Sequence, residues 1–250
     1  MEYSAKMSGK LCAVIIPMYN ESECAKNSVL TILAEINKLN DVCDLVIVED
    51  GSNDKTYEIL NELNKNNKFK LIRHSENHGY GSACKTGAHY AYTKSYNYAL
   101  FMDSDLTNDP RDIIHFVKYM KDDCDVIKAT RYHPNGGVVG VPIMRRIIST
   151  FGNHLLRIIV TNKVTDITNG FRAVKLKLFV EVDCKERGFS VIVEEFCSIF
   201  TKDLKIANVP VILGNRSVEQ RATSFNYNIP MFWKYLKYPI FYRIKYMIGI

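Results

Sequence analysis

The sequence predicts an α/β protein whose central sheet is mostly parallel and is flanked by helices. Short apolar segments alternate with segments of helical periodicity as far as Thr130. Polar loops rich in acids and glycines follow these apolar segments, and in a parallel sheet such loops gather at one edge. The chain has 250 residues, 47% of them hydrophobic, which suits one large domain with a substantial core.

Strands and helices are expected to alternate in the first half of the chain. Short, mostly apolar runs predict strands over residues 11–16, 44–49, 69–72, 98–102 and 125–129. Apolar residues at helical spacing predict helices over residues 29–36, from 54 to 63, from 79 onward and over 113–120. Helical crossovers of this kind are what joins neighbouring parallel strands.

The alternation stops after Thr130. A glycine-rich loop follows, helical periodicity returns over residues 143–160, and the apolar run over 206–213 predicts a late strand. No internal repeat, low-complexity segment or linker divides the chain. We therefore expect one globular domain over residues 1–225 and a basic, aromatic helical extension over residues 226–250.

Positive charge is concentrated in two parts of the chain. The net charge is +6, and neither the stretch between Asp125 and Asp166 nor the chain after Glu219 contains an acid. The C-terminal part interleaves lysines and arginines with aromatic residues, a pattern typical of surfaces that bind anionic membranes. Single-stranded nucleic acid could also bind such a surface, and a final pair of helices packed on the core with solvated lysines would explain it as well. We expect a membrane-surface partner and no nucleic acid.

Signals for export or membrane insertion are missing from the sequence. We see no basic apolar leader and no uninterrupted apolar run of about 20 residues, which a membrane-spanning helix needs. The seven cysteines are scattered and form no Cys-x-x-Cys pair, which is typical of reduced thiols. We expect a cytoplasmic protein that is peripheral on the cytosolic face of a membrane.

Two acids separated by one residue follow the apolar run that ends at Met102. Side chains alternate in an extended chain, so Asp103 and Asp105 should lie on the same side and share a cation. Mg²⁺ and Mn²⁺ are hard divalent cations that accept such carboxylate ligands. The alternative is that these acids cap the next helix, but Asp109, directly before Pro110, is better placed for that role.

The loops that follow the predicted strands should converge on one crevice, because ligands of an open parallel sheet bind at the carboxyl ends of its strands. These loops contain Pro17–Glu21, Glu49–Gly51, His74–Gly81 and Asp103–Asp105. The glycines in the third loop could instead indicate a dinucleotide-binding turn. A dinucleotide-binding turn would follow the first strand, and its glycines would lie closer together in the sequence. We therefore favour a crevice that holds a metal over the cofactor site of a dehydrogenase.

Several motifs occur in the order typical of one enzyme family. IPMYNES, VEDGSNDKT, NHGYGSACKTG and MDSDLTNDP resemble the family 2 glycosyltransferases, which use nucleotide-diphospho-sugars and have the GT-A fold. Further on, KATRYHPNGG, MRRIISTFGNHLLRIIV, VTDITNGFRAVK, GFSVIVEEF and NVPVILGNR resemble the polyprenyl-phosphate sugar synthases, such as dolichyl-phosphate mannose and glucose synthases. The resemblance runs from Leu11 to about Ser224, which makes residues 1–225 the expected catalytic domain.

The resemblance implies a donor site for a GDP- or UDP-hexose. Asp103 and Asp105 would hold the divalent metal on the diphosphate, and Thr107 stands where many relatives have a glutamine as a further ligand. The nucleotide-sugar pocket would be lined by Pro17, Tyr19, Glu21, Asp50, Lys85 and Asp103.

The resemblance also implies an acceptor site for dolichyl or undecaprenyl phosphate. Arg131, Arg145 and Arg216 match arginines that hold the acceptor phosphate, and with the two metal-binding acids they form the expected catalytic set. The remaining matches to the acceptor-side motif and the helix after it are Asp166, Asn169, Gly170, Phe171 and Glu194 or Glu195.

The chemistry of a phosphate acceptor fits an arginine-rich site. A phosphate monoester is mostly ionised at neutral pH, its second pKa being about 6, so it can attack the anomeric carbon without a protein base. A sugar hydroxyl would need such a base. Arginine matches phosphate through paired hydrogen bonds. The alternative is that these arginines form ordinary ion pairs within the protein.

The sequence is therefore compatible with three functions. The leading one is an inverting, metal-dependent transfer of a mannose- or glucose-type hexose from a nucleotide diphosphate to a polyprenyl phosphate. The second is a soluble family 2 enzyme that acts on a glycan or protein hydroxyl. The third is a non-catalytic nucleotide-sugar-binding or membrane scaffold subunit, against which the complete Asp-x-Asp pair argues.

Overall fold

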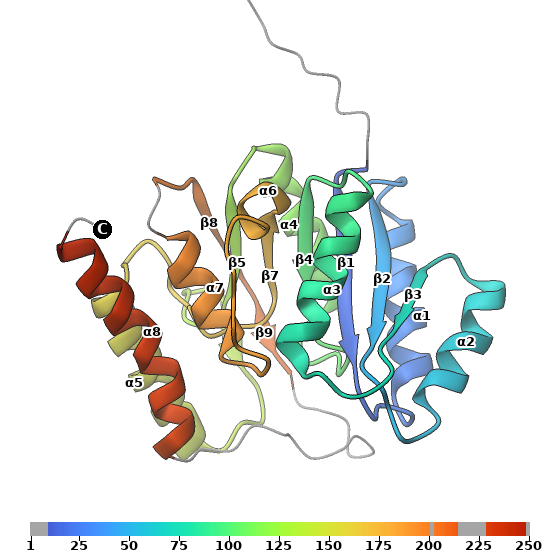
Figure 1. Ribbon diagram of the computed structural model, residues 1–250, viewed down its shortest axis with the longest axis horizontal. Helices are drawn as coiled ribbons and strands as arrows, with labels where there is room; N and C mark the ends of the chain where they lie inside the picture. Colours follow the sequence, from blue (N-terminus) through green and yellow to red (C-terminus); the bar gives the residue numbers. More distant parts are fainter. Residues whose placement is uncertain (1–9, 201–202, 215–228, 249–250) are drawn as a thin grey trace, which may run out of the picture.

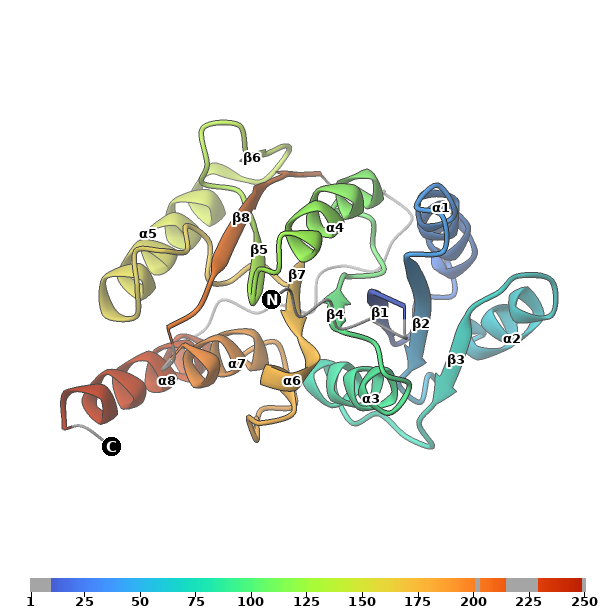
Figure 2. The ribbon, with the colours of Figure 1, turned by 90° about the horizontal axis from the view of Figure 1, so that it is seen from above.

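The computed structural model describes residues 10–200, 203–214 and 229–248. A seven-stranded sheet runs through the molecule in the order β3-β2-β1-β4-β7-β5-β8 (Figure 1). Helices cover both of its faces, with α1 and α4 on one and α3 and α7 on the other (Figure 2). The mostly parallel α/β architecture predicted from the sequence is confirmed.

With the exception of β7, the strands of the large sheet lie close to the predicted runs. They are β1 (Cys12–Met18), β2 (Cys43–Glu49), β3 (Lys70–Arg73), β4 (Tyr98–Phe101), β5 (Val126–Thr130), β7 (Arg172–Lys175) and β8 (Ile206–Pro210). A small second sheet pairs β6 (Gly137–Val138) with β9 (Ile212–Leu213). The single late strand expected over 206–213 is therefore two strands that belong to different sheets.

The helices follow the predicted alternation. They are α1 (Ala25–Asn37), α2 (Thr56–Asn66), α3 (Tyr80–Thr93), α4 (Ile113–Lys121), α5 (Ile143–Ile159), α6 (Leu176–Phe179), α7 (Val191–Ile199) and α8 (Ile229–Met247). Apolar side chains on one face of α1 and α4 pack on one side of the sheet, and those of α3 and α7 pack on the other. Helix α8 lies in the C-terminal region that was expected to be a basic, aromatic helical extension.

Strand β7 was not expected from the sequence. It lies between β4 and β5 and is antiparallel to both. All its residues are buried, yet its two ends are charged: Arg172 pairs with Glu195, and Lys175 pairs with Asp123 and Asp125. A short segment with charges at both ends has neither an apolar run nor an alternating pattern, so sequence periodicity could not identify it.

The described residues include no helix that is long and apolar enough to cross a membrane. All seven cysteines are buried free thiols, in agreement with the prediction of reduced cysteines.

Candidate active site

The loops after β1 and β2 are joined by hydrogen bonds between their side chains and backbones. Asn20 N donates to Ser52 Oγ at 2.9 Å, and Glu21 N donates to Thr56 Oγ1 at 2.8 Å. Parallel pairing of β1 with β2 brings these loops to the same edge of the sheet. The predicted convergence of the first two loops is therefore observed, and it places Pro17, Tyr19 and Glu21 beside the β2 loop.

Asp50 is buried and its carboxylate holds the loop that leads into α3. Its oxygens accept hydrogen bonds from His78 N at 3.0 Å and from Gly79 N at 2.8 Å, and His74 Nδ1 lies 2.6 Å from Oδ1. Gly79 has a φ of 93°, and a Cβ there would lie 2.6 Å from Arg187 O. Asp50 is expected to line the nucleoside pocket, and in the structure its carboxylate fixes the backbone at His78 and Gly79.

Asp103 and Asp105 lie in a turn beyond the end of β4, which stops at Phe101. The backbone is turned at Ser104 and Asp105 and Leu106 has a φ of 55°, so the extended-chain alternation used to place both acids on one side does not apply. Ser28 Oγ, on α1, donates to Ser104 O at 2.5 Å and anchors the turn. Tertiary contacts, not strand geometry, position this pair.

Thr107 holds the second acid of the pair. Its Oγ1 donates to Asp105 Oδ1 at 2.7 Å and its amide donates to the same oxygen at 3.0 Å. Gly214 N donates to Thr107 O at 2.8 Å, so the end of the β9 strand region also fixes the turn. Thr107, predicted as a metal ligand, is seen to orient Asp105.

The oxygen donors of this turn fit a hard divalent cation. Among the described residues, no group of three or more histidines, cysteines, aspartates or glutamates could enclose a metal ion. A cation held by Asp103 and Asp105 would therefore take its other ligands from phosphate oxygens and water, as is usual for Mg²⁺ bound together with a phosphorylated substrate.

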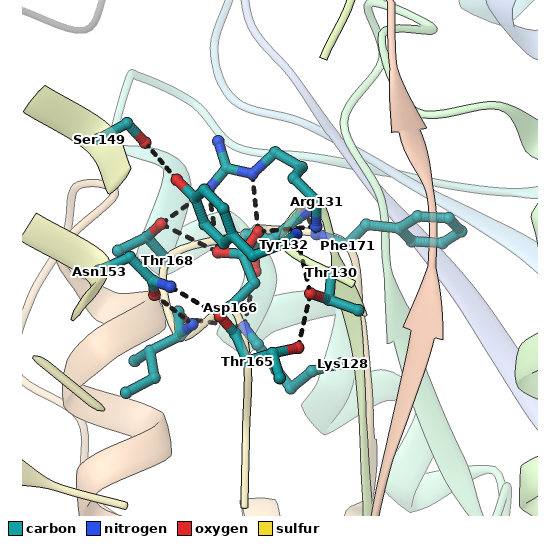
Figure 3. Close-up of polar contacts among 12 residues, drawn as sticks. Lys128, Thr130, Arg131, Tyr132, Ser149, Asn153, Thr165, Asp166, Thr168 and Phe171 are labelled. Atoms are coloured by element: carbon teal, nitrogen blue, oxygen red, sulfur yellow. Dashed lines mark hydrogen bonds and ion pairs between the residues drawn. The ribbon is translucent and has the colours of Figure 1, made fainter. Parts of the chain in front are cut away.

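The acceptor-side residues Arg131 and Asp166 form a bidentate ion pair (Figure 3). Arg131 Nε and Nη2 donate to the two carboxylate oxygens at 2.7 and 2.9 Å, and Arg131 N donates to Oδ2 at 3.2 Å. Burial by itself raises the pKa of Asp166, but the Arg131 charge and hydrogen bonds outweigh it and lower the pKa. Of the two interpretations of Arg131, the ion pair is observed directly.

The turn that carries Asp166 is fixed from two sides (Figure 3). From α5, Asn153 Nδ2 donates to Thr165 O at 2.7 Å, and its Oδ1 accepts from Ile167 N at 2.9 Å. From β5, Lys128 Nζ donates to the carbonyls of Ile167 and Asn169 at 3.1 and 2.7 Å. Burial, with the nearby Arg172 charge, lowers the pKa of Lys128 to about 7.

Donor-side and acceptor-side motifs meet at Gly170. A Cβ atom on this glycine would lie 3.4 Å from Asp103 Oδ2 and 3.2 Å from Tyr80 Oη. The turn after β4 that contains Asp103 therefore lies next to the turn that follows Asp166.

Lys85 and Glu194 both hold the loop between α6 and α7. Lys85 Nζ donates to Cys184 O at 2.8 Å. The buried Glu194 accepts from the amides of Lys185 and Glu186, both at 2.8 Å. The described contacts of Lys85 and Glu194 thus fix the backbone of residues 184–186.

Several residues of the site were not expected. Arg172 donates to both carboxylate oxygens of Glu195, at 2.8 and 2.5 Å, and to Gly170 O at 2.9 Å. Lys128 has a recognisable signal, a lysine inside the otherwise apolar strand β5. Arg172 and Tyr80 offer no such signal, because only the fold brings them together.

Two predicted arginines have no described side-chain contacts. Arg145 lies in the first turns of α5, and Arg216 lies outside the described residues. Asn169 lies in the same turn as Asp166, and its Oδ1 accepts from Phe171 N at 3.0 Å. The side chain of Arg145 and the whole of Arg216 lie outside the described part of the structure, whereas the contacts of Arg131 are described.

Comparisons with known proteins place the chain in a family. The family model for glycosyl transferase family 2 matches residues 13–182. A dolichol-phosphate mannosyltransferase of Pyrococcus furiosus is 31% identical over 208 residues, which are 82% of this chain and 57% of that protein. A polyprenol monophosphomannose synthase of Mycolicibacterium smegmatis is 23% identical over 210 residues, 82% of this chain and 78% of that protein.

Solved structures show the same fold. Glucosyl-3-phosphoglycerate synthase from Mycobacterium tuberculosis, crystallised with Mn²⁺, uridine diphosphate and phosphoglyceric acid, superimposes with a TM-score of 0.67 at 18% identity. The match covers 94% of this chain and 79% of that one. The chain therefore has the GT-A fold and belongs to glycosyl transferase family 2.

Proposed function

We propose that the protein is an inverting, metal-dependent hexosyltransferase. It would move a mannose- or glucose-type sugar from a GDP- or UDP-linked donor to a dolichyl or undecaprenyl phosphate. The observation that carries the proposal is the approach of Asp103 to Gly170, because it joins a cation-binding turn to the turn built on Arg131 and Asp166. The names of the two relatives above favour a polyprenyl phosphate acceptor and a mannose-type sugar.

Departure of a nucleoside diphosphate leaves negative charge that the site must stabilise. Mg²⁺ or Mn²⁺ at Asp103 and Asp105 would supply that stabilisation when it is bound. Thr107 keeps Asp105 oriented, and Ser28 keeps the turn in place. The chain's own contribution to donor binding is therefore a preformed turn whose oxygens need little reorganisation.

The acceptor phosphate would approach from the side of Asp166. Asp166 fixes the plane of the Arg131 guanidinium through two hydrogen bonds, and a fixed guanidinium loses less entropy when a phosphate approaches it. We propose that Arg131, Arg145 and Arg216 surround this phosphate. Because the phosphate is already ionised, the reaction needs no protein base.

The outer faces of α5 and α8 are consistent with an acceptor that lies in a membrane. The exposed apolar residues of α5 share one face that spans about 100° of the helix, opposite the buried Leu156. They are Ile143, Met144, Ile147, Phe151 and Ile158. A helix that turns its apolar stripe away from the core needs another apolar phase or partner to cover it.

Helix α8 has a similar outer stripe, formed by Trp233, Ile240, Phe241 and Ile244, and Ile248 just beyond its end is exposed too. Its opposite face packs on the core through Tyr235, Tyr238 and Tyr242. The two helices contact one another at one end of the molecule (Figures 1 and 2). With exposed Arg146, Lys234 and Arg243 beside the stripes, this surface suits the interface of an anionic membrane. We therefore propose peripheral attachment to a cytosolic membrane face.

Transfer of radiolabel to lipid tests the proposal directly. The protein would be incubated with GDP-[¹⁴C]mannose or UDP-[¹⁴C]glucose, Mn²⁺ and vesicles that contain a polyprenyl phosphate. We expect an organic-extractable, acid-labile product that depends on metal and on the lipid phosphate. Label found only on an added glycan or protein would favour a hydroxyl acceptor, and the absence of both transfer and donor hydrolysis would favour a binding subunit.

A further inference from the structure

The buried hydroxyl of Tyr80 makes no close hydrogen bond to the described residues, although the Arg172 guanidinium and the Cys84 thiol are polar groups near it. The residue begins α3, directly after Gly79, whose amide is held by Asp50. Its ring stacks on Phe189, with centroids 4.6 Å apart and ring planes at 28°. The side chain is thus held firmly while its polar atom is unsatisfied, an uncommon arrangement that asks for a functional explanation.

The hydroxyl faces Asp103 across Gly170. A Cβ atom on Gly170 would lie 3.2 Å from Tyr80 Oη and 3.4 Å from Asp103 Oδ2. Gly170 is itself fixed, because its carbonyl accepts from Arg172 Nη1 at 2.9 Å. Glycine at this position keeps the space between the two oxygens clear of a side chain.

We propose that Tyr80 is a positioning residue for Asp103: its hydroxyl donates to Oδ2 when metal and nucleoside diphosphate bind, and so orients the carboxylate towards the cation. The inference rests on the proposed function. A phenol is protonated at neutral pH and is a good donor to a carboxylate. Metal-binding carboxylates are commonly oriented by such hydrogen bonds. The terminal torsion of an aspartate is soft, so the Asp103 carboxylate can turn when its ligands bind.

Replacement of Tyr80 by phenylalanine tests the proposal, because it removes only the hydroxyl and keeps the stack on Phe189. Mn²⁺ would be titrated by calorimetry in the presence of UDP and, separately, GDP. We expect the Mn²⁺ affinity to fall roughly tenfold, the effect of one hydrogen bond to a charged group. The Tm of the ligand-free variant should equal or exceed that of the wild type, because an unsatisfied buried group is removed.

A purely structural role predicts the opposite pattern, a lower Tm with unchanged Mn²⁺ affinity. Tyr98→Phe is the matched control, since its buried hydroxyl donates to Cys124 O at 2.8 Å at the far end of β4. This control should lower the Tm and leave Mn²⁺ binding unchanged. Gly170→Ala should reproduce the loss of affinity by separating the two oxygens.

A double-mutant cycle decides whether Tyr80 acts through Asp103. In an Asp103→Asn background, measured at raised Mn²⁺, Tyr80→Phe should have little further effect. Equal Mn²⁺ affinity of Tyr80→Phe and wild type, or a full additional loss in the Asp103→Asn background, would overturn the inference alone. Failure of the wild type to bind either nucleotide with Mn²⁺ would overturn the proposed function as well.

Discussion

Arg131 donates through Nε and Nη2 to both carboxylate oxygens of Asp166, at 2.7 and 2.9 Å. The carboxylate is fully buried and the guanidinium is only 15% exposed. An arginine that the sequence motif assigns to a phosphate acceptor is thus also a structural partner inside the protein. Its substitution should therefore affect both stability and transfer, and these effects need separate measurements.

Arg131→Met should destabilise the protein by about 3 kcal/mol, because it leaves a buried carboxylate without its partner. Urea unfolding at neutral pH measures this loss. The double variant Arg131→Met/Asp166→Asn should recover part of it, since the uncompensated charge is then gone. A single variant as stable as the wild type would show that the ion pair does not form in solution.

Arg145→Ala separates phosphate binding from stability. If Arg145 contacts the acceptor phosphate, the KM for the lipid phosphate should rise about tenfold or more, the effect of one charge-assisted contact. Nucleotide-sugar binding should be unchanged. The neighbouring Arg146, which is exposed on the same helix, provides the control. Equal effects of Arg145→Ala and Arg146→Ala would indicate a general membrane attraction instead.

Asp105→Asn should lower kcat by about a hundredfold or more, because removal of one of two carboxylates weakens the cation site. Asp109→Asn, in the same loop but at the start of the next helical turn, should retain activity. Chelation with EDTA should abolish transfer by the wild type, and added Mn²⁺ or Mg²⁺ should restore it. Full activity in the presence of EDTA would contradict a metal-dependent reaction.

Thr107 should affect metal binding through its hydrogen bond to Asp105. Thr107→Val removes the hydroxyl that donates to Oδ1 and should weaken Mn²⁺ binding about tenfold. Thr107→Ser keeps the hydroxyl and should rescue most of the affinity. Titration of both variants with Mn²⁺ in the presence of nucleotide compares them. A valine variant that binds Mn²⁺ as tightly as the wild type would show that the Thr107 hydroxyl does not act through Asp105.

Lys128 should make stability depend on pH. The folded protein releases its proton near pH 7, whereas the unfolded chain keeps it to the ordinary lysine pKa of 10.5. The unfolded state therefore binds more protons between these values, so this lysine makes stability rise as the pH increases through that window. The free energy of unfolding of Lys128→Met should rise less with pH than that of the wild type, while exposed Lys118→Met should follow the wild type.

The outer stripe of α5 should govern membrane binding. Ile147→Glu places a charge in that stripe and should reduce cosedimentation with anionic vesicles several-fold. Ile114→Glu is matched to it, since both isoleucines are 54% exposed but Ile114 lies on α4. Vesicle binding that is lost equally in both variants would argue against a specific membrane-binding face.

The path of the chain could be read in its first half because each element there has its own local pattern. The runs that form β1 and β4 are apolar throughout, β2 is apolar over residues 45–48, and α4 repeats apolar residues on one face. The Asp-x-Asp pair was found for a similar reason, since two acids after an apolar run are conspicuous. Each of these features depends on a few neighbouring residues, so the local sequence is enough to identify it.

The tertiary structure decided how the pieces of the site are joined. Insertion of β7 between β4 and β5 brings Gly170 to Asp103, and no local pattern encodes that pairing. It likewise decided that Arg131 pairs with Asp166 and that Asp50 binds backbone amides. The physical reason is that a buried charge takes whatever partner the fold places beside it, and those partners come from distant parts of the chain.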